Sequence, residues 1–348
     1  MMARRFIIPF CVALTILVGY NAAIFVSSKK TQRQHMLALL NQIPPVTQCL
    51  FLGNSLVEAG CDANAFDSAW PGETQPHALN IGLGATSPVE HYLILKQALE
   101  RAPHVKFLVY GFFDDQLESA SSGTWDELIG NRAFSYYFPQ EAASFYTPGS
   151  EVEKLKLEMI SRVPMLSERS SIWDKVEMLR RRVDEIGMPK HKTNRYGRVS
   201  DFSALEAADV PSFINRCNSA IHDGDSFSPP IQGILDLAAQ HDVTVFLVEM
   251  PISPSHRKTF YSLPVWAEMR EHLKTIAAKE HAVLITASDW VPDGDDFDDA
   301  VHLNSAGAKT FSRQLALTLA RMTSHQPNDT IARSHAAKPQ LMAAAKLK

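Results

Sequence analysis

The chain has 348 residues, of which 45% are hydrophobic and 21% charged, enough for one large domain or two modest ones. The formal net charge of −4 argues against nucleic acid as the main partner. None of the four cysteines lies in a CxxC pair, so no zinc site and no other metal or cofactor is predicted. Cys49 and Cys61 are interpreted as small buried residues, with a disulfide in an oxidising compartment as the alternative.

The first predicted element is an apolar segment over residues 6–26, with basic residues on both sides. Its length matches the roughly 20 residues that a membrane-spanning helix needs. An uncleaved signal anchor is favoured over a cleaved signal peptide, because the segment is long for a signal peptide and lacks an A-x-A site. The basic flanks leave the orientation open, and an amino terminus inside is favoured because a large domain follows. We therefore expect a single-pass protein of the cell membrane with an extracytoplasmic, periplasmic domain.

Strand and helix patterns then alternate along the chain. Residues 31–45 predict a helical tether of about 22 Å, which ends at a Pro-Pro pair. Apolar strands are predicted over 46–53, 77–83, 105–110, 243–250 and 282–286. Helices are predicted over 87–101, 265–279 and 305–322, the first of them capped by Ser87 with Glu90 three residues later. This order predicts an α/β three-layer sandwich around a mostly parallel, five-stranded sheet.

The pattern changes between residues 113 and 230, where strand signals are scarce and helices are expected over 151–163 and 172–186. We interpret this part as a helical insertion into one domain that spans 46–325, after an anchor (1–30) and the tether (31–45). Its basic residues are interpreted as a solvated face, with an anionic polymer or lipid headgroup as the alternative partner; they are Arg180, Arg181, Arg182, Lys190, Lys192, Arg195 and Arg198. The polar, aperiodic residues 326–348 predict a disordered tail.

Two short motifs suggest nucleophilic catalysis. Ser55 follows the first predicted strand, and Asp299 precedes His302 by three residues just before the last helix. A serine becomes a nucleophile when a histidine takes its proton and an acid orients that histidine. In a parallel sheet, sites form at the carboxyl ends of the strands, where Ser55 falls. The catalytic residues predicted are thus Ser55, His302 and Asp299; His256 is a rival base that has no acid three residues before it.

These motifs resemble those of the SGNH (GDSL-type) hydrolase superfamily over residues 46–112 and 240–322. Gly53-Asn54-Ser55 matches the first block with Asn in place of the usual Asp, and Asp299 with His302 matches the fourth. Residues 80–86 resemble the second block, with Gly84 as its glycine. The resemblance implies a flavodoxin-like sheet, ester chemistry without a cofactor, and an oxyanion held by the amides of Ser55 and Gly84.

The third block departs from that pattern. The family places an asparagine, whose side chain donates to the oxyanion, where this chain has Phe113. Losing such a donor typically lowers the rate about 100- to 1000-fold. Asp114 and Asp115 cannot replace it because carboxylates only accept hydrogen bonds, whereas Gln116 carries a donor. Three explanations of this departure stay open. Another group completes the oxyanion hole, or the oxyanion hole has only two donors, or the enzyme is slow.

The combination of an anchor, an extracytoplasmic SGNH domain and a helical insertion resembles the proteins of polysaccharide O-acetylation and of D-alanine transfer. The resemblance implies an acylated glycan or lipid-linked substrate and a multi-spanning membrane acyltransferase as partner. Water as acceptor would make the protein an esterase, and a sugar hydroxyl would make it an acyltransferase. The alternative of a different class is a non-catalytic glycan-binding or assembly module, which the Phe113 departure favours.

Overall fold

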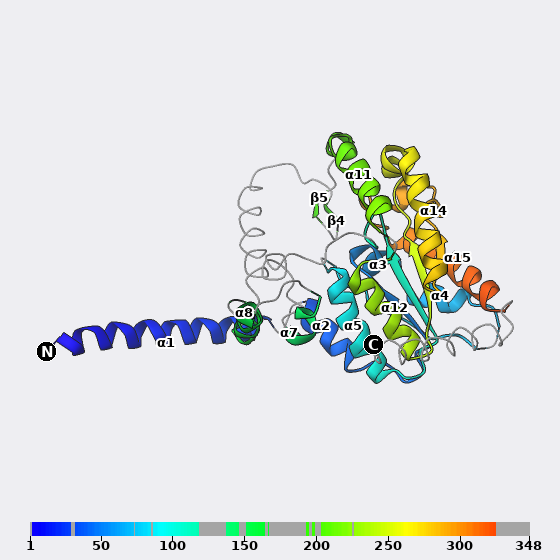
Figure 1. Ribbon diagram of the computed structural model, residues 1–348. Coiled ribbons are helices and arrows are strands. Elements are labelled where there is room, and N and C mark those ends of the chain that lie inside the picture. Colours follow the sequence, from blue (N-terminus) through cyan, green and yellow to red (C-terminus); the bar gives the residue numbers. More distant parts are fainter. Residues whose placement is uncertain are drawn as a thin grey trace, which may run out of the picture. The chain divides into compact units, whose positions relative to one another are not determined.

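A computed structural model describes residues 2–28, 32–72, 74–84, 86–117, 137–145, 151–163, 166, 193–194, 197–198, 203–224 and 226–324. The contacts within the chain define two compact units, whose helices and strands are labelled in Figure 1. Unit 1 comprises Met1–Gln42 and Ser122–Lys190, and unit 2 comprises Ile43–Ser121 and His191–Lys348. The candidate site residues all belong to unit 2.

Unit 1 contains helices α1 (Met2–Ser28), α2 (Gln32–Leu40), α7 (Pro139–Ala143) and α8 (Glu151–Arg162), of which α7 packs against α8. Within α1, Ile7–Ile24 has a mean hydropathy of 2.1, and by length and composition it is able to cross a membrane. A signal sequence near an amino terminus has the same properties. Helix α2 falls within the predicted tether, and α8 matches the helix predicted over 151–163.

Unit 2 is built on a five-stranded sheet in the order β2-β1-β3-β6-β7, with every neighbouring pair parallel. The strands are β1 (Cys49–Leu52), β2 (Ala78–Asn80), β3 (Phe107–Phe112), β6 (Thr244–Glu249) and β7 (Val283–Thr286). The predicted α/β class is therefore confirmed. Strand β1 begins three residues later than predicted because a turn holds the preceding segment, in which the Thr47 amide donates to the Pro44 carbonyl at 3.0 Å.

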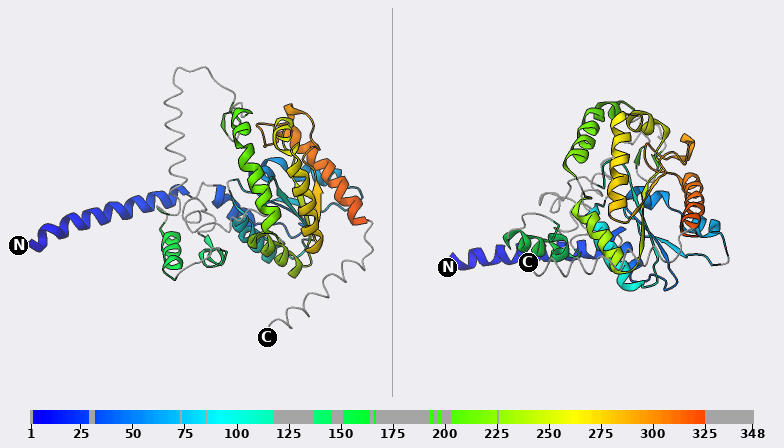
Figure 2. Two further views of the ribbon diagram at one scale, coloured as in Figure 1. Left: turned by 45° about the horizontal axis from the view of Figure 1, so that its top comes forward. Right: turned by 45° about the vertical axis from the view of Figure 1, so that its right-hand side comes forward.

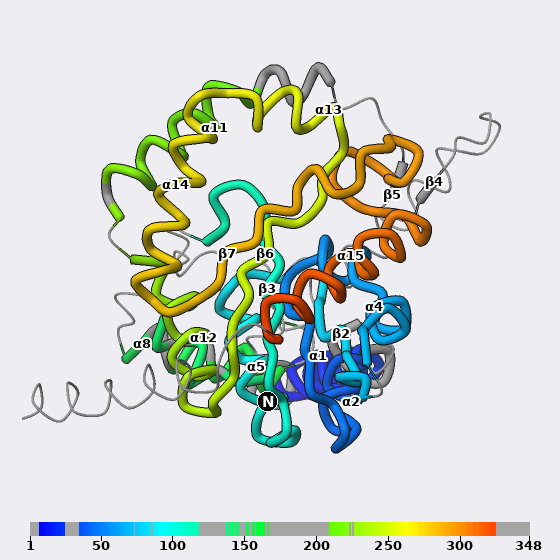
Figure 3. Tube along the Cα trace, turned by 90° about the vertical axis from the view of Figure 1, so that its right-hand side faces the viewer, coloured from blue at the N-terminus to red at the C-terminus, as the bar shows by residue number. Residues whose placement is uncertain are grey.

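Helices cover both faces of the sheet (Figure 3), and successive side chains of a strand point to opposite faces. Phe51, Val109 and Phe246 belong to a core shared with α3 (Ser55–Gly60), α4 (Ala63–Ala69) and α15 (Ser305–Ser324). Phe51 contacts Phe66 of α4 edge to face, with ring centroids 5.0 Å apart. Helices α5 (Pro88–Arg101) and α12 (Pro229–Gln240) pack against each other on the opposite face. The helices cover the two faces of the sheet, and loops lie at the carboxyl ends of the strands.

Most predicted helices of unit 2 are present with bounds close to those expected. Helix α5 begins with the predicted Ser87/Glu90 capping box, and α14 (Pro264–Lys279) and α15 match their patterns. The predicted insertion includes helix α11 (Ser203–Asp223), which lies beside α14 (Figure 2), and the small antiparallel pair β4 (Thr193–Asn194) and β5 (Gly197–Arg198). The predicted helix 172–186, the tail 326–348 and all the basic residues but Arg198 lie outside the described residues. Cys49 and Cys61 are both buried free thiols, as the favoured interpretation had it.

Candidate active site

The sheet order places Ser55 where the chain changes direction. After β1 the chain pairs first on one side with β2 and then on the other with β3, which makes the carboxyl end of β1 a topological switch point. Helix α3 begins at Ser55 because Asn54 caps it, its side-chain oxygen accepting from the Leu56 amide at 3.0 Å. A Cβ atom on Gly53 would lie 2.8 Å from the Gly111 carbonyl oxygen, so only glycine fits between β1 and β3 here.

A tight loop presents Asp299 and His302. Phe297 and Leu303 form an antiparallel bridge, and the Asp298 amide donates to the His302 carbonyl at 2.8 Å. Leu303 is buried in the core beside α15, which anchors the loop. The Ser253 amide, after β6, donates to the Ala300 carbonyl at 3.0 Å and fixes the tip of the loop to the next segment.

The structure brings the three predicted catalytic side chains into one hydrogen-bonded chain. His302 Nε2 lies 2.8 Å from Ser55 Oγ, and His302 Nδ1 lies 2.8 Å from Asp299 Oδ2. Because a carboxylate only accepts, Nδ1 carries the proton and the Nε2 atom of the neutral ring accepts from the serine hydroxyl. This tautomer is the one in which His302 can remove the Ser55 proton, although the catalytic role itself stays a prediction.

Asp299 is held as an anion. Its Oδ1 atom accepts from the backbone amides of Val301 at 3.0 Å and His302 at 2.8 Å. Partial burial favours the neutral acid, but the hydrogen bond from the His302 ring and the two amide bonds outweigh it, so the pKa of Asp299 is lowered. An anionic Asp299 keeps the imidazole oriented and stabilises its protonated form.

Gly84 lies beside Ser55 as expected, but its amide already has a partner. A Cβ atom on Gly84 would be 3.6 Å from the Ser55 Cβ, so the two residues are neighbours. The Gly84 amide donates to Glu58 Oε2 at 2.8 Å, and the oxyanion role predicted for this amide would require that bond to break. No motif in the sequence pointed to Glu58. The signal available was its position three residues after Ser55, which places both side chains on one side of a helix.

The segment after β3 carries Phe113 at the position where the resemblance would place an asparagine. Phe113 packs against the hydrophobic core, and it supplies no hydrogen-bond donor. The side-chain oxygen of Gln116 is buried without a hydrogen-bond partner among the described residues. Asp115 forms an ion pair with Arg216 of α11 at 3.3 Å. Phe113 therefore cannot replace the missing asparagine, and of the next three residues only Gln116 carries a side-chain amide that can donate.

His256 has an acidic partner that the sequence did not reveal. It lies in α13 (Pro254–His256), and its Nε2 atom is 3.4 Å from Asp114 Oδ1. Asp114 has a φ of +50°, which is uncommon for a residue with a side chain, and its amide donates to the Tyr261 hydroxyl at 3.0 Å. The acid that the local sequence of His256 lacks thus comes from the segment after β3, whereas the histidine bonded to Ser55 is His302.

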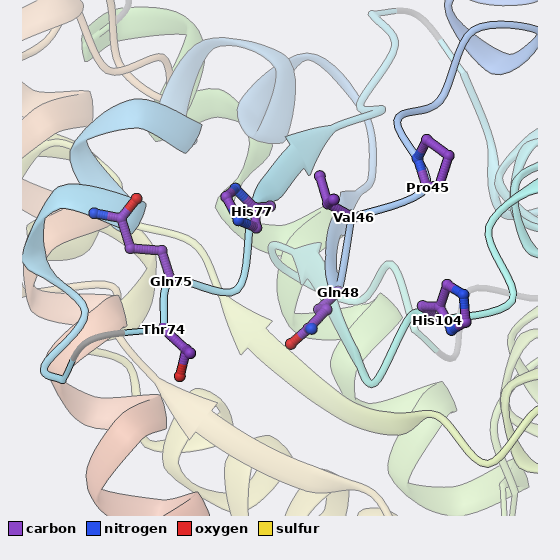
Figure 4. A pocket seen from close by; sticks show the side chains of 7 residues that line it. All are labelled: Pro45, Val46, Gln48, Thr74, Gln75, His77 and His104. Atoms are coloured by element: carbon purple, nitrogen blue, oxygen red, sulfur yellow. The ribbon is translucent and has the colours of Figure 1, made fainter.

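Cavities lie at both ends of the sheet. A cavity of about 570 Å³ opens at the amino ends of β1, β2 and β3, opposite the end where Ser55 lies (Figure 4). It is lined by Pro45, Val46, Gln48, Thr74, Gln75, His77 and His104. A second, of about 420 Å³, is at the carboxyl ends of β6 and β7 and includes Arg257, Tyr261 and Arg270. Among the described residues no group of three or more His, Cys, Asp or Glu side chains is arranged to hold a metal ion.

Comparisons with known proteins find similarity in structure only. Searches of protein-family profiles and of curated proteins give no match. A candidate acylhydrolase from Bacteroides fragilis aligns with a TM-score of 0.38 at 11% identity, over 84% of this chain and 99% of its own. A candidate arylesterase from Agrobacterium tumefaciens aligns with a TM-score of 0.33 at 13% identity, over 78% of this chain and 98% of its own. At these scores the likeness carries no argument about what this chain does, so function has to be argued from the site.

Proposed function

We propose that this chain is a serine esterase or O-acyltransferase of the SGNH type that forms an acyl-serine at Ser55. The observation that carries the proposal is the continuous hydrogen-bonded chain from Ser55 through His302 to Asp299, with 2.8 Å at each of its two links. The carboxylate, the imidazole tautomer and the serine hydroxyl are in the order that nucleophilic catalysis requires. Ser55 and His302 are 247 residues apart in the sequence, so their contact is not a consequence of being neighbours in the chain.

The proposed reaction has two halves. Ser55 Oγ attacks the carbonyl carbon of an ester as His302 Nε2 takes its proton, and the resulting imidazolium gives that proton to the leaving alkoxide. An acceptor hydroxyl then gives its proton to His302 Nε2 and attacks the acyl-serine, and the imidazolium returns this proton to Ser55 Oγ as the acyl–oxygen bond to the serine breaks. Water as acceptor yields a carboxylic acid, and a sugar hydroxyl yields a new ester. Asp299 stays ionised throughout because its pKa is lowered.

The proposed setting of the reaction is the outer face of a membrane. Helix α1 contains an apolar segment, Ile7–Ile24, that is long enough to anchor the chain. An anchored site would meet acylated glycans or lipid-linked substrates close to the bilayer. A multi-spanning acyltransferase that delivers acyl groups across the membrane would be the partner of such a protein.

A second candidate function is that of a non-catalytic glycan-binding or assembly module. Two observations favour it: Phe113 provides no oxyanion donor, and the Gly84 amide is already bonded to Glu58. A site with one remaining donor would catalyse weakly, because each donor is worth about 100- to 1000-fold in rate. The intact Ser55–His302–Asp299 geometry argues for the enzyme, since a binding module has no need of it.

The first prediction tests this choice. Ser55→Ala and His302→Ala should each lower the hydrolysis of p-nitrophenyl acetate at least about 1000-fold, because nucleophile and base act as one unit. Their melting temperatures should stay close to that of the parent. Ser68→Ala, which removes an exposed hydroxyl from α4, serves as the matched control and should keep full activity. Measurable turnover that is equal in the parent and in both site variants would refute the proposal, because the chemistry would then lie elsewhere.

A further inference from the structure

Glu58 lies in a cluster with Gly84 and Ser55, and the proposed mechanism gives Glu58 no part. Glu58 Oε2 accepts from the Gly84 amide at 2.8 Å, and the ideal Cβ position of Gly84 is also 2.8 Å from this oxygen. The same Cβ position is 3.6 Å from the Ser55 Cβ. Glu58 Oε2 and Ser55 Cβ are thus both neighbours of Gly84, and the carboxylate is bonded to the amide to which the family resemblance assigns the oxyanion.

The surrounding structure fixes this contact from both sides. Glu58 follows Ser55 by three residues on α3, so both side chains leave the same side of the helix. The Asn80 side chain donates to the carbonyls of Val57 and Cys61, both at 2.8 Å, and its oxygen accepts from the Gly82 amide at 2.8 Å. Asn80 thus ties the segment that leads to Gly84 onto α3, which holds the Gly84 amide within reach of Glu58.

This arrangement is unfavourable for the transition state of acyl transfer. Stabilisation of an oxyanion requires donors that point at the position where negative charge develops. A carboxylate that accepts from one of those donors removes it, and its own negative charge repels the oxyanion. Since Phe113 contributes no donor either, the free protein has lost two of the three groups that the family uses.

We propose that Glu58 is a gating residue: its carboxylate occupies the oxyanion site of the free protein and must leave the Gly84 amide before Ser55 is acylated. This inference rests on the function proposed above. It explains how an intact catalytic triad coexists with an occupied oxyanion site. A substrate or partner that offers Glu58 another hydrogen-bond donor would open the site, so the protein would react slowly with small esters that offer none.

A purely structural role for Glu58 predicts the opposite response to substitution. If the carboxylate only braced the segment before Gly84 against α3, its removal would loosen the site and lower both activity and stability. If it is a gate, its removal frees the Gly84 amide and raises activity. The sign of the change in rate separates the two roles.

The experiment uses the full chain in detergent micelles. For the parent, Glu58→Ala and Glu58→Gln, one measures kcat/KM for p-nitrophenyl acetate and the rate at which a fluorophosphonate probe modifies Ser55. Freeing one donor should raise both rates of Glu58→Ala about 10- to 1000-fold. Glu58→Gln should gain less, because its amide oxygen can still accept from Gly84 although the charge is gone. Glu268→Ala, which removes an exposed carboxylate from α14, is the matched control and should match the parent.

Each outcome has a distinct meaning. Rates of Glu58→Gln and Glu58→Ala that equal or fall below the parent's, with Ser55 still labelled in the parent, would overturn the gate and leave the proposed function standing. Should Glu58→Ala fail to fold, the nearly isosteric Glu58→Gln decides the question alone. Absence of labelling above the Ser55→Ala background in every variant would overturn the proposed function and the gate with it.

Discussion

At the scale of single residues, the chemistry depends on which nitrogen of His302 carries its proton. Asp299 decides this by accepting from Nδ1, and two backbone amides hold the carboxylate in place. Asp299→Asn puts an amide group against Nδ1 that can donate, which favours the tautomer with the proton on Nε2, facing Ser55. We expect kcat/KM to fall up to about 10,000-fold with little change in melting temperature. A loss smaller than about tenfold would show that Asp299 does not orient the base.

Glu249 at the end of β6 provides a prediction about pH and stability. Its side chain is 1% exposed, and burial raises its pKa although Arg270 donates to it at 2.8 Å and Trp266 at 3.2 Å. An acid whose pKa is raised on folding binds its proton more tightly in the folded state. Its contribution to stability is therefore complete below the unfolded pKa of about 4.5 and is lost as the pH rises through the folded pKa.

Chemical denaturation of the parent and of Glu249→Gln between about pH 4 and pH 8 measures this contribution. The parent should lose stability relative to the variant as the pH rises from about 4.5, because glutamine does not titrate. Loss of the ion pair with Arg270 also changes the free energy of unfolding of Glu249→Gln, but by an amount that stays the same between about pH 4 and pH 8. A difference that is independent of pH, or one that grows in favour of the parent, would contradict the raised pKa.

At the scale of elements, the short helix α3 determines where the nucleophile lies. Asn54 caps this helix through the Leu56 amide, and the helix packs against α15, which follows the His302 loop. Asn54→Ala should lower the free energy of unfolding by about 1 kcal/mol, while Asn54→Asp, which keeps a capping side chain, should cost only a few tenths. Urea denaturation and ester hydrolysis of both variants test this. Asn54→Ala should lose activity along with stability, whereas Asn54→Asp should keep its activity. An Asn54→Ala variant as stable as the parent would mean that the cap contributes nothing.

At the scale of the whole molecule, the open question that experiment can decide is whether α1 stays attached. We expect the expressed chain in the membrane fraction, released by detergent but not by high salt, with a mature amino terminus before residue 26. The physical reason is the apolar segment Ile7–Ile24, whose transfer into a bilayer is favourable. Cell fractionation and amino-terminal sequencing measure both properties. A mature chain that starts after residue 26 and stays soluble without detergent would instead indicate a secreted esterase.

The sequence by itself determined the features that arise from interactions among residues close together in the chain. Apolar segments and caps predicted the five strands, helix α5 with its Ser87/Glu90 box, and hence the α/β class. The family motifs identified Ser55, His302 and Asp299 as candidates. These features are readable because side-chain periodicity and capping depend on neighbours within a few positions.

Only the tertiary structure decided which of these residues meet. The contact between Ser55 and His302, the bond from Gly84 to Glu58 and the pairing of His256 with Asp114 all join different elements at the carboxyl edge of the sheet. No local pattern encodes such contacts, because they depend on the order of the strands and on how α3 and the loops pack against that edge. For the same reason the family resemblance implied a free donor at Gly84, whereas the fold showed that a carboxylate from the helix of the nucleophile already accepts from this amide.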